Sequence, residues 1–265
     1  MAMSTAVAGP APWLTIGRGS VTYTQAEAEA VLAGFAFGTE QLIWPNSFTL
    51  PADPGLATGP RAIMRHTWSY RIFDCAPSSP YGFTVHDLLV IAALNPRATA
   101  SDYLQMEAIL PDLNEALAHI AVTQTFWMLP RAELGTTPPP SGTSAWWLWR
   151  AWSLLMGLDN VNVAKTYKTL HHKRPWLFPN FDTKTMHAMG NEGAWQALHD
   201  ELNTQATQFT ELEQWFAVEA TERGGVAITR LRIHDVLLWG ALEEGGQERR
   251  RLLDAGNDAL GRPRA

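Results

Sequence analysis

The sequence is poor in cysteine and has no long apolar run. Cys75 is the only cysteine among 265 residues, which excludes an internal disulfide and a multi-cysteine zinc site and is typical of a reducing cytoplasm. The longest apolar runs, such as residues 88–94, are far shorter than the roughly 18–20 residues that a membrane-spanning helix requires. We therefore expect a cytoplasmic protein with no membrane partner.

Basic residues are fewer than acidic ones, 20 Lys and Arg against 26 Asp and Glu. The net charge is therefore -6, and the sequence pI is about 5.7. Such a chain has no global electrostatic reason to bind nucleic acid. Aromatic residues are abundant, with 12 Trp, 10 Phe and 5 Tyr, which excludes a mostly disordered chain. The basic residues are concentrated between residues 150 and 187, where six of them accompany two acidic residues. This segment therefore has a local excess of positive charge within an acidic chain.

Apolar residues recur at helical spacing through most of the chain. Residues 210–223 and 229–243 are each predicted to form one helix, and residues 101–127 two helices separated near Pro111. Residues 68–73 alternate apolar and polar side chains as a short strand does. Strand signals are too few for a sheet-based fold. The sequence therefore predicts an all-α fold of many helices with at most a short strand pair near the N-terminus.

Three consecutive prolines at residues 138–140 mark the clearest interruption of the helical pattern. They lie in a Pro-rich linker that could divide two helical lobes. The expected division is a frayed lead-in at 1–20, an N-terminal lobe at 21–130, the linker at 131–143, a C-terminal lobe at 144–245 and a polar tail at 246–265.

The most informative segment is a predicted helical hairpin followed by an extended stretch. One helix ends near a tight turn at 157–160, and a second helix continues to about His172. Pro175 and Pro179 then forbid helix up to Asp182, which lies at the start of the next helix. An aspartate at that position can cap its own helix or point at a ligand in the groove beside the hairpin.

The extended stretch reads K-R-P-W-L-F-P-N-F-D from Lys173 to Asp182. With the hairpin before it, the chain resembles a bacterial family of uncharacterised proteins, a domain of unknown function that carries the pattern K-R-P-x-L-x-P-x-x-D. The likeness extends from about Tyr70 to Leu242 and implies no activity. The order of hairpin, extended stretch and aspartate is also similar, more distantly, to the helix-hairpin-helix DNA glycosylases.

The resemblance to the glycosylases implies a catalytic site. In those enzymes the backbone amides of the hairpin turn bind a DNA phosphate, and the aspartate stabilises positive charge at the sugar of a flipped nucleotide. Asp182 matches this aspartate, and Asn162 lies where bifunctional members carry a nucleophilic lysine, which implies a monofunctional hydrolase. The turn here reads L-D-N-V-N instead of G-x-G, so that Asp159 adds a negative charge beside the phosphate position.

The candidate site residues follow from this resemblance. Asp182 is the candidate catalytic residue, and Trp176 and Trp149 are candidates for stacking on a base or a flat ligand. We expect no cofactor, since the sequence has no Walker loop or Rossmann fingerprint. We expect no metal, since the neighbouring His171 and His172 would diverge by about 100° on a helix. The predicted contacts to nucleic acid are Asn160, Asn162, Lys165, Lys168, Lys173 and Arg174.

Each of these roles has a structural alternative. Asp182 could serve only as a helix cap, the cations could form a solvated surface, and the tryptophans could be core residues. The functional hypothesis is Asp-assisted hydrolysis of an N-glycosidic bond in DNA or in a nucleobase-containing ligand. The alternative is a non-catalytic helical protein that binds an aromatic small molecule or a protein partner. A third hypothesis is an inherited scaffold whose site has been lost.

Overall fold

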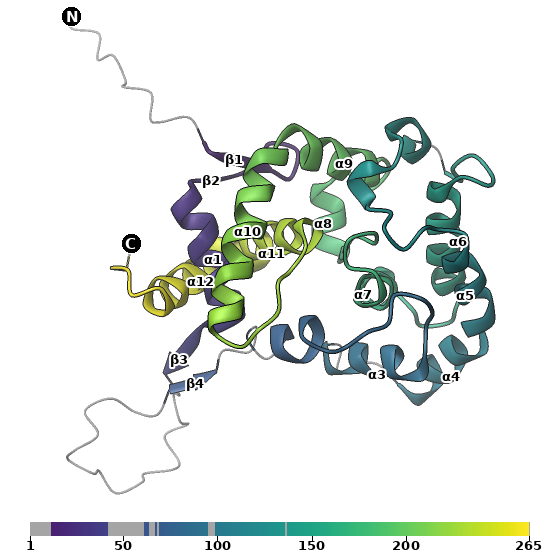
Figure 1. The fold of residues 1–265 in the computed structure, drawn as a ribbon, viewed down its shortest axis with the longest axis horizontal. Coiled ribbons are helices and arrows are strands. Elements are labelled where there is room, and N and C mark those ends of the chain that lie inside the picture. Colours follow the sequence, from purple (N-terminus) through teal and green to yellow (C-terminus); the bar gives the residue numbers. More distant parts are fainter. Residues whose placement is uncertain are drawn as a thin grey trace, which may run out of the picture.

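The computed structural model describes residues 12–41, 61–63, 67, 69–94, 99–135 and 137–264. Helices dominate these residues, so the predicted all-α fold with a short strand pair near the N-terminus is confirmed (Figure 1). The N-terminal half contains β1 (Leu14–Ile16), β2 (Val21–Tyr23), α1 (Gln25–Phe37), β3 (Thr39–Gln41), β4 (Arg61–Ile63), η1 (Tyr70–Asp74), α3 (Val85–Leu94), α4 (Ala100–Ala108), α5 (Leu110–Ala118), η2 (Phe126–Met128) and η3 (Arg131–Gly135).

The C-terminal half is helical throughout its described elements. The predicted hairpin is formed by its first two helices, and the aspartate that follows them begins the third. The elements are α6 (Ser144–Met156), α7 (Val163–Lys173), α8 (Thr183–Ala188), α9 (Ala194–Thr204), α10 (Ala206–Glu222), α11 (Arg230–Leu242), η4 (Glu243–Gly246) and α12 (Gln247–Ala259).

The strand expected at residues 68–73 is wrong where the structure describes it. Trp68 lies outside the described residues, and Tyr70–Asp74 forms the π-helical turn η1. Tyr70 and Phe73 are buried, whereas Ile72 is 41% exposed. A strand would have placed Tyr70 and Ile72 on the same face. Spacing by three residues puts Tyr70 and Phe73 together on the buried face instead. The strands pair elsewhere, β1 with β2 and β3 with β4, both antiparallel.

The two ends of the described chain share one packed unit. Leu14 and Ile16, in the segment expected to be frayed, are fully buried in β1, while residues 1–11 lie outside the described part. The segment expected to be a polar tail contains α12, which packs on α1 (Figure 1). The two helices cross closely because Gly34 and Gly256 meet the facing backbone, where any side chain would overlap it. The division into two lobes at residues 131–143 stays a prediction.

Helix α7 occupies a central position in the molecule. It packs against α3 on one side and against α6, its partner in the hairpin, on another (Figure 1). Its C-terminal end leads through residues 174–182 into α8, which packs on α11. The extended conformation expected between Pro175 and Pro179 is wrong at its start. The Arg174 carbonyl accepts the N–H groups of Leu177 at 2.9 Å and of Phe178 at 3.1 Å, which closes a turn there. Among the described helices, none combines the length and the apolar composition that crossing a membrane would need.

Candidate functional site

A cleft of about 680 Å³ lies beside α7, the second helix of the hairpin. Its walls are built by α7, the stretch before α8, α11, and the segment from η4 into α12. The side chains that carry its chemistry are Lys168, Asn180, Asp182, Asp235 and Trp239. We call this space the Asp182 cleft.

Asp182 is both a helix cap and a wall residue of the cleft. Its Oδ1 accepts the Thr185 backbone N–H at 2.8 Å and the Thr185 hydroxyl at 3.0 Å, and its own N–H donates to that hydroxyl at 2.9 Å. This is a capping box, so the N-cap interpretation is confirmed. No hydrogen bond to Oδ2 occurs among the described residues. The catalytic role of Asp182 stays a prediction.

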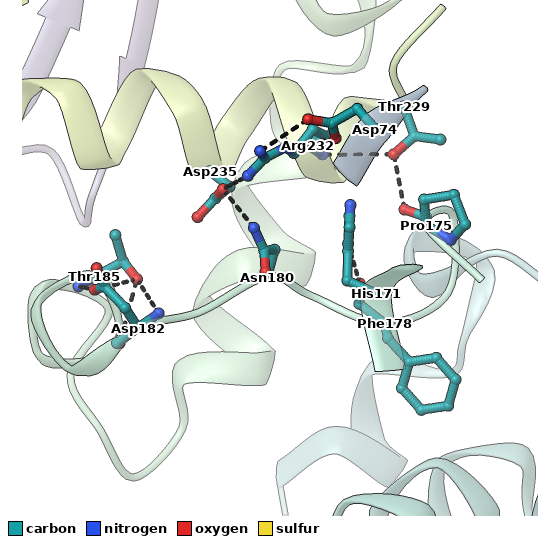
Figure 2. Close-up of polar contacts among 10 residues, drawn as sticks. All are labelled: Asp74, His171, Pro175, Phe178, Asn180, Asp182, Thr185, Thr229, Arg232 and Asp235. Carbon is teal, nitrogen blue, oxygen red and sulfur yellow. Dashed lines mark hydrogen bonds and ion pairs between the residues drawn. The ribbon is translucent and has the colours of Figure 1, made fainter. Parts of the chain in front are cut away.

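Asp235 is a buried carboxylate that also lines the Asp182 cleft (Figure 2). It lies on α11, is 9% exposed, and its Oδ2 accepts the Asn180 Nδ2 at 2.9 Å and an Arg232 guanidinium N–H. Burial raises the pKa of Asp235 to about 6; Arg232 opposes this rise, and the negative charge of Asp182 adds to it. Asp235 can therefore hold a proton near neutral pH.

Arg232 fixes the geometry behind Asp235 (Figure 2). On its other side the guanidinium donates two hydrogen bonds to Asp74, from Nε at 2.8 Å and from Nη2 at 2.9 Å. Thr229 caps the same helix, and its hydroxyl donates to the Pro175 carbonyl at 2.7 Å, which ties α11 to the stretch before α8. The positions of Asp235 and of the Asp182 segment are thus coupled through α11.

Two lysines predicted to contact phosphate lie inside the protein. Lys165 Nζ donates to the Asp102 carboxylate and to the Asn160 carbonyl, each at 2.8 Å. Lys173 Nζ donates to Asp87 Oδ2 at 2.8 Å, and its side chain is fully buried. The prediction that these cations form a solvated face is wrong, because buried carboxylates from α4 and α3 hold them.

Arg174 is also directed inward. Its residue is 1% exposed, and burial lowers the pKa of its guanidinium. The guanidinium donates to three backbone carbonyls, those of Pro80, Leu117 and Ile120. It therefore ties the end of α7 to the α5 region instead of facing solvent. A phosphate contact by Arg174 would require these three hydrogen bonds to break.

The other predicted polar contacts are distributed between the cleft and the hairpin turn. Lys168 lines the Asp182 cleft. Asn162 is exposed and caps α7, accepting the Lys165 N–H at 3.0 Å. Asn160 is exposed in a left-handed conformation with φ 61°. In the same turn the Asp159 N–H donates to the Gln105 side chain at 2.9 Å, so one amide of the predicted phosphate site already has a partner.

The two predicted stacking residues lie outside the Asp182 cleft. Trp176 is half-buried against the core, and its Nε1 donates to the Val122 carbonyl at 2.9 Å. Trp149 is half-buried on α6 and lines neither described pocket. The aromatic residues that do line the cleft are Phe35 and Trp239.

Sequence reasoning did not single out Asp235, Asn180 or Trp239. One signal was available for Asp235, because it stands in α11 between the apolar residues Ile233 and Val236, and an aspartate inside an apolar helix needs a partner. Asn180 and Trp239 carry no such local signal. Among the described residues, no group of three or more His, Cys, Asp or Glu side chains is arranged to hold a metal ion.

A family of unknown function (DUF6308) matches residues 59–241, and the chain belongs to this family. The match includes α7, residues 174–182 and Asp235. Its extent agrees with the likeness expected from about Tyr70 to Leu242. No curated protein and no solved structure matches the chain. The distant similarity to DNA glycosylases stays a prediction.

Proposed function

We propose that the protein hydrolyses the N-glycosidic bond of a small nucleobase-containing compound in the Asp182 cleft. The observation that carries this proposal is the presence of two carboxylates with different surroundings in one cleft. Asp235 is buried with a pKa raised to about 6, whereas Asp182 is held by the first turn of α8. Pairs of carboxyl groups whose environments differ in this way divide acid and base roles in glycoside-cleaving enzymes.

The two aspartates take complementary parts in the reaction. Protonated Asp235 donates its proton to the leaving nitrogen as the bond between the sugar and the base breaks. Asp182 stabilises the positive charge that develops on the sugar and orients the attacking water. Water supplies the hydroxyl group of the product sugar and one proton, which restores the acid. The base leaves with the proton that came from Asp235.

Two further groups of the cleft suit a nucleobase. Asn180 Oδ1 is buried and accepts no hydrogen bond among the described residues, so it can accept an N–H of a base. Trp239 supplies a flat ring against which a base can stack. Asp235, which itself accepts a hydrogen bond from Arg232, holds the Asn180 side chain in place by accepting from its Nδ2. An amide edge and an aromatic ring together recognise a planar heterocycle.

The size and charge of the cleft favour a small substrate over a DNA duplex. A volume of about 680 Å³ lies within the range of small-molecule sites, roughly 300–1,000 Å³. The cleft is lined by four basic and five acidic residues, so it lacks the positive excess that a phosphate backbone requires. Lys165, Lys173 and Arg174, which would have supplied that excess, are held by internal acceptors. A nucleoside fits this balance better than a polymer.

Incubation with a panel of ribo- and deoxynucleosides, followed by chromatography for released base, tests the proposal. We expect the wild-type protein to release base from at least one nucleoside, and Asp182→Asn and Asp235→Asn each to lower kcat by about 100-fold or more. Asp112→Asn is the matched control, because Asp112 is exposed on α5 and lies outside the cleft. Absence of released base from every nucleoside, or full activity in Asp182→Asn, would contradict the proposal.

A non-catalytic binding protein for a flat small molecule is the second candidate, and Trp239 in the cleft favours it. The same nucleoside panel separates the two functions when binding is followed by calorimetry. Binding without release of base, weakened by Trp239→Ala and unaffected by Asp182→Asn, is the result expected from a binding protein.

A further inference from the structure

A second, smaller pocket of about 160 Å³ lies on the other side of Arg232, which lines both spaces. His171 and His172 form its buried floor, and Phe73 and Trp176 contribute aromatic rings. Its rim includes the exposed residues Ser78 and Ala227, so it can be reached from solvent. We call this space the His171 pocket.

His171 presents a bare nitrogen to this pocket. Its Nδ1 lies 2.7 Å from the Phe178 carbonyl oxygen, and because a carbonyl only accepts hydrogen bonds, Nδ1 carries the hydrogen. Burial and the nearby positive charge of Arg232 lower the pKa of His171 to about 3, so the ring is neutral at physiological pH. Nε2 therefore has a lone pair and no hydrogen.

Nε2 of His171 lacks a hydrogen-bond donor among the described residues, although the residue is only 1% exposed. Figure 2 shows this nitrogen on the edge of the ring opposite the Phe178 contact, pointing toward the space beneath Arg232 and Thr229. A buried acceptor without a donor is unfavourable, so a donor from a ligand would be favoured there. His172 also lines the pocket, but its Nε2 faces the Asp87 carboxylate, 3.6 Å from Oδ1.

The charges around the pocket already neutralise one another. Asp74 forms an ion pair with Arg232, and Lys173 forms one with Asp87. A charged ligand would have to leave water without finding an unmatched partner, which is costly. The volume is close to that of a cavity of about 150 Å³ that holds one benzene molecule. These properties select an uncharged compound of one ring.

We propose that the His171 pocket binds a small uncharged one-ring compound that donates an N–H or O–H hydrogen bond to His171 Nε2. This site is separate from the Asp182 cleft, and the inference does not depend on nucleoside hydrolysis. The ring of the ligand lies against Phe73 and Trp176, which line the pocket. The pocket thus combines the aromatic side chains of Phe73 and Trp176 with polar groups, among which His171 Nε2 is the proposed anchor.

Pyrazole is the probe for this site, because it is a neutral five-membered ring with one N–H donor. We expect the full chain to bind pyrazole by calorimetry, and one non-protonated histidine ring nitrogen to shift in the NMR spectrum of ¹⁵N-histidine-labelled protein. Binding of 1-methylpyrazole, which lacks the donor, should be roughly fivefold weaker or more, since one hydrogen bond is lost. Equal affinity for the two compounds would overturn the proposed anchor.

A substitution that fills the pocket provides an independent test. Ala227→Phe places a ring at the exposed rim and should abolish pyrazole binding without disturbing the core. Ala132→Phe is the matched control, because Ala132 is exposed on η3 and lines neither described pocket. Unchanged pyrazole binding in Ala227→Phe would overturn the location of the site. Absence of pyrazole binding to the wild-type protein would show that the pocket holds only water, and this result also overturns the proposal.

Discussion

Asp87 and Asp235 are both buried aspartates that pair with a buried cation, yet their proton affinities are shifted in opposite directions. Burial alone would raise the pKa of Asp87, but Lys173 and hydrogen bonds from Thr84 and Ser78 hold it below its usual range. The pKa of Asp235 is raised to about 6 by burial, and the Asp182 carboxylate adds to the rise.

The difference lies in what else surrounds each carboxylate. Asp87 is surrounded by donors, so its charge is stabilised and it connects α3 to the end of α7. Asp235 accepts hydrogen bonds from Arg232 and Asn180, but it also shares a cleft with the Asp182 carboxylate, whose negative charge raises its pKa. A carboxylate held against a like charge in a cleft is typical of a functional site. Asp87 is therefore structural, and Asp235 belongs to the proposed chemistry.

The largest expected effect is at the structural aspartate. Lys173→Met leaves the Asp87 carboxylate buried without its ion-pair partner, and we expect it to lower the free energy of unfolding by about 3–5 kcal/mol. Lys184→Met is the matched control, because the Lys184 ion pair with Glu243 is partly exposed and should be worth no more than about 1 kcal/mol. Urea denaturation measures both variants. A loss from Lys173→Met as small as that of the control would contradict a structural role for Asp87.

A second prediction compares the aspartates directly. Asp87→Asn removes a charged acceptor of several hydrogen bonds and should cost about 2–3 kcal/mol of unfolding free energy. Asp235→Asn removes a buried charge that faces Asp182, while its side-chain oxygen can still accept from Arg232. We therefore expect a change within about 1 kcal/mol, measured by the same denaturation. Equal losses in the two variants would show that Asp235 is also structural.

The sequence predicted the elements whose signals are local. The hairpin and the cap at Asp182 follow from spacing and from residue preferences within a few positions. The burial of Lys165 and Lys173 could not be predicted this way, because their carboxylate partners lie 63 and 86 residues away on other helices. A basic residue on a helix looks the same in sequence whether it faces solvent or a buried acid.

Of the candidate site, only the part with a local sequence signal was predicted. Asp182 was found because a helix start is a local pattern. The state of Asp235 depends on Arg232, three residues away, but also on Asn180 and Asp182, which approach from a different segment. A resemblance based on the order of elements indicated Asp182 but carried no information about Asp235. Tertiary contacts alone bring the two carboxylates into one cleft.

The smallest expected effect is a pH dependence that also distinguishes the two aspartates. The folded-state pKa of Asp235 is raised to about 6, above its unfolded value, so the folded protein binds the proton more tightly. Its ionisation therefore lowers stability above pH 6, and this cost disappears as the pH falls toward 4. Between pH 7 and pH 5 the wild-type protein should gain about 1 kcal/mol of unfolding free energy relative to Asp235→Asn. The Asp87 contribution has the opposite sign, because a lowered pKa stabilises the fold at neutral pH and is lost in acid. Parallel pH profiles for the wild-type protein and Asp235→Asn would contradict the raised pKa and remove the proposed acid.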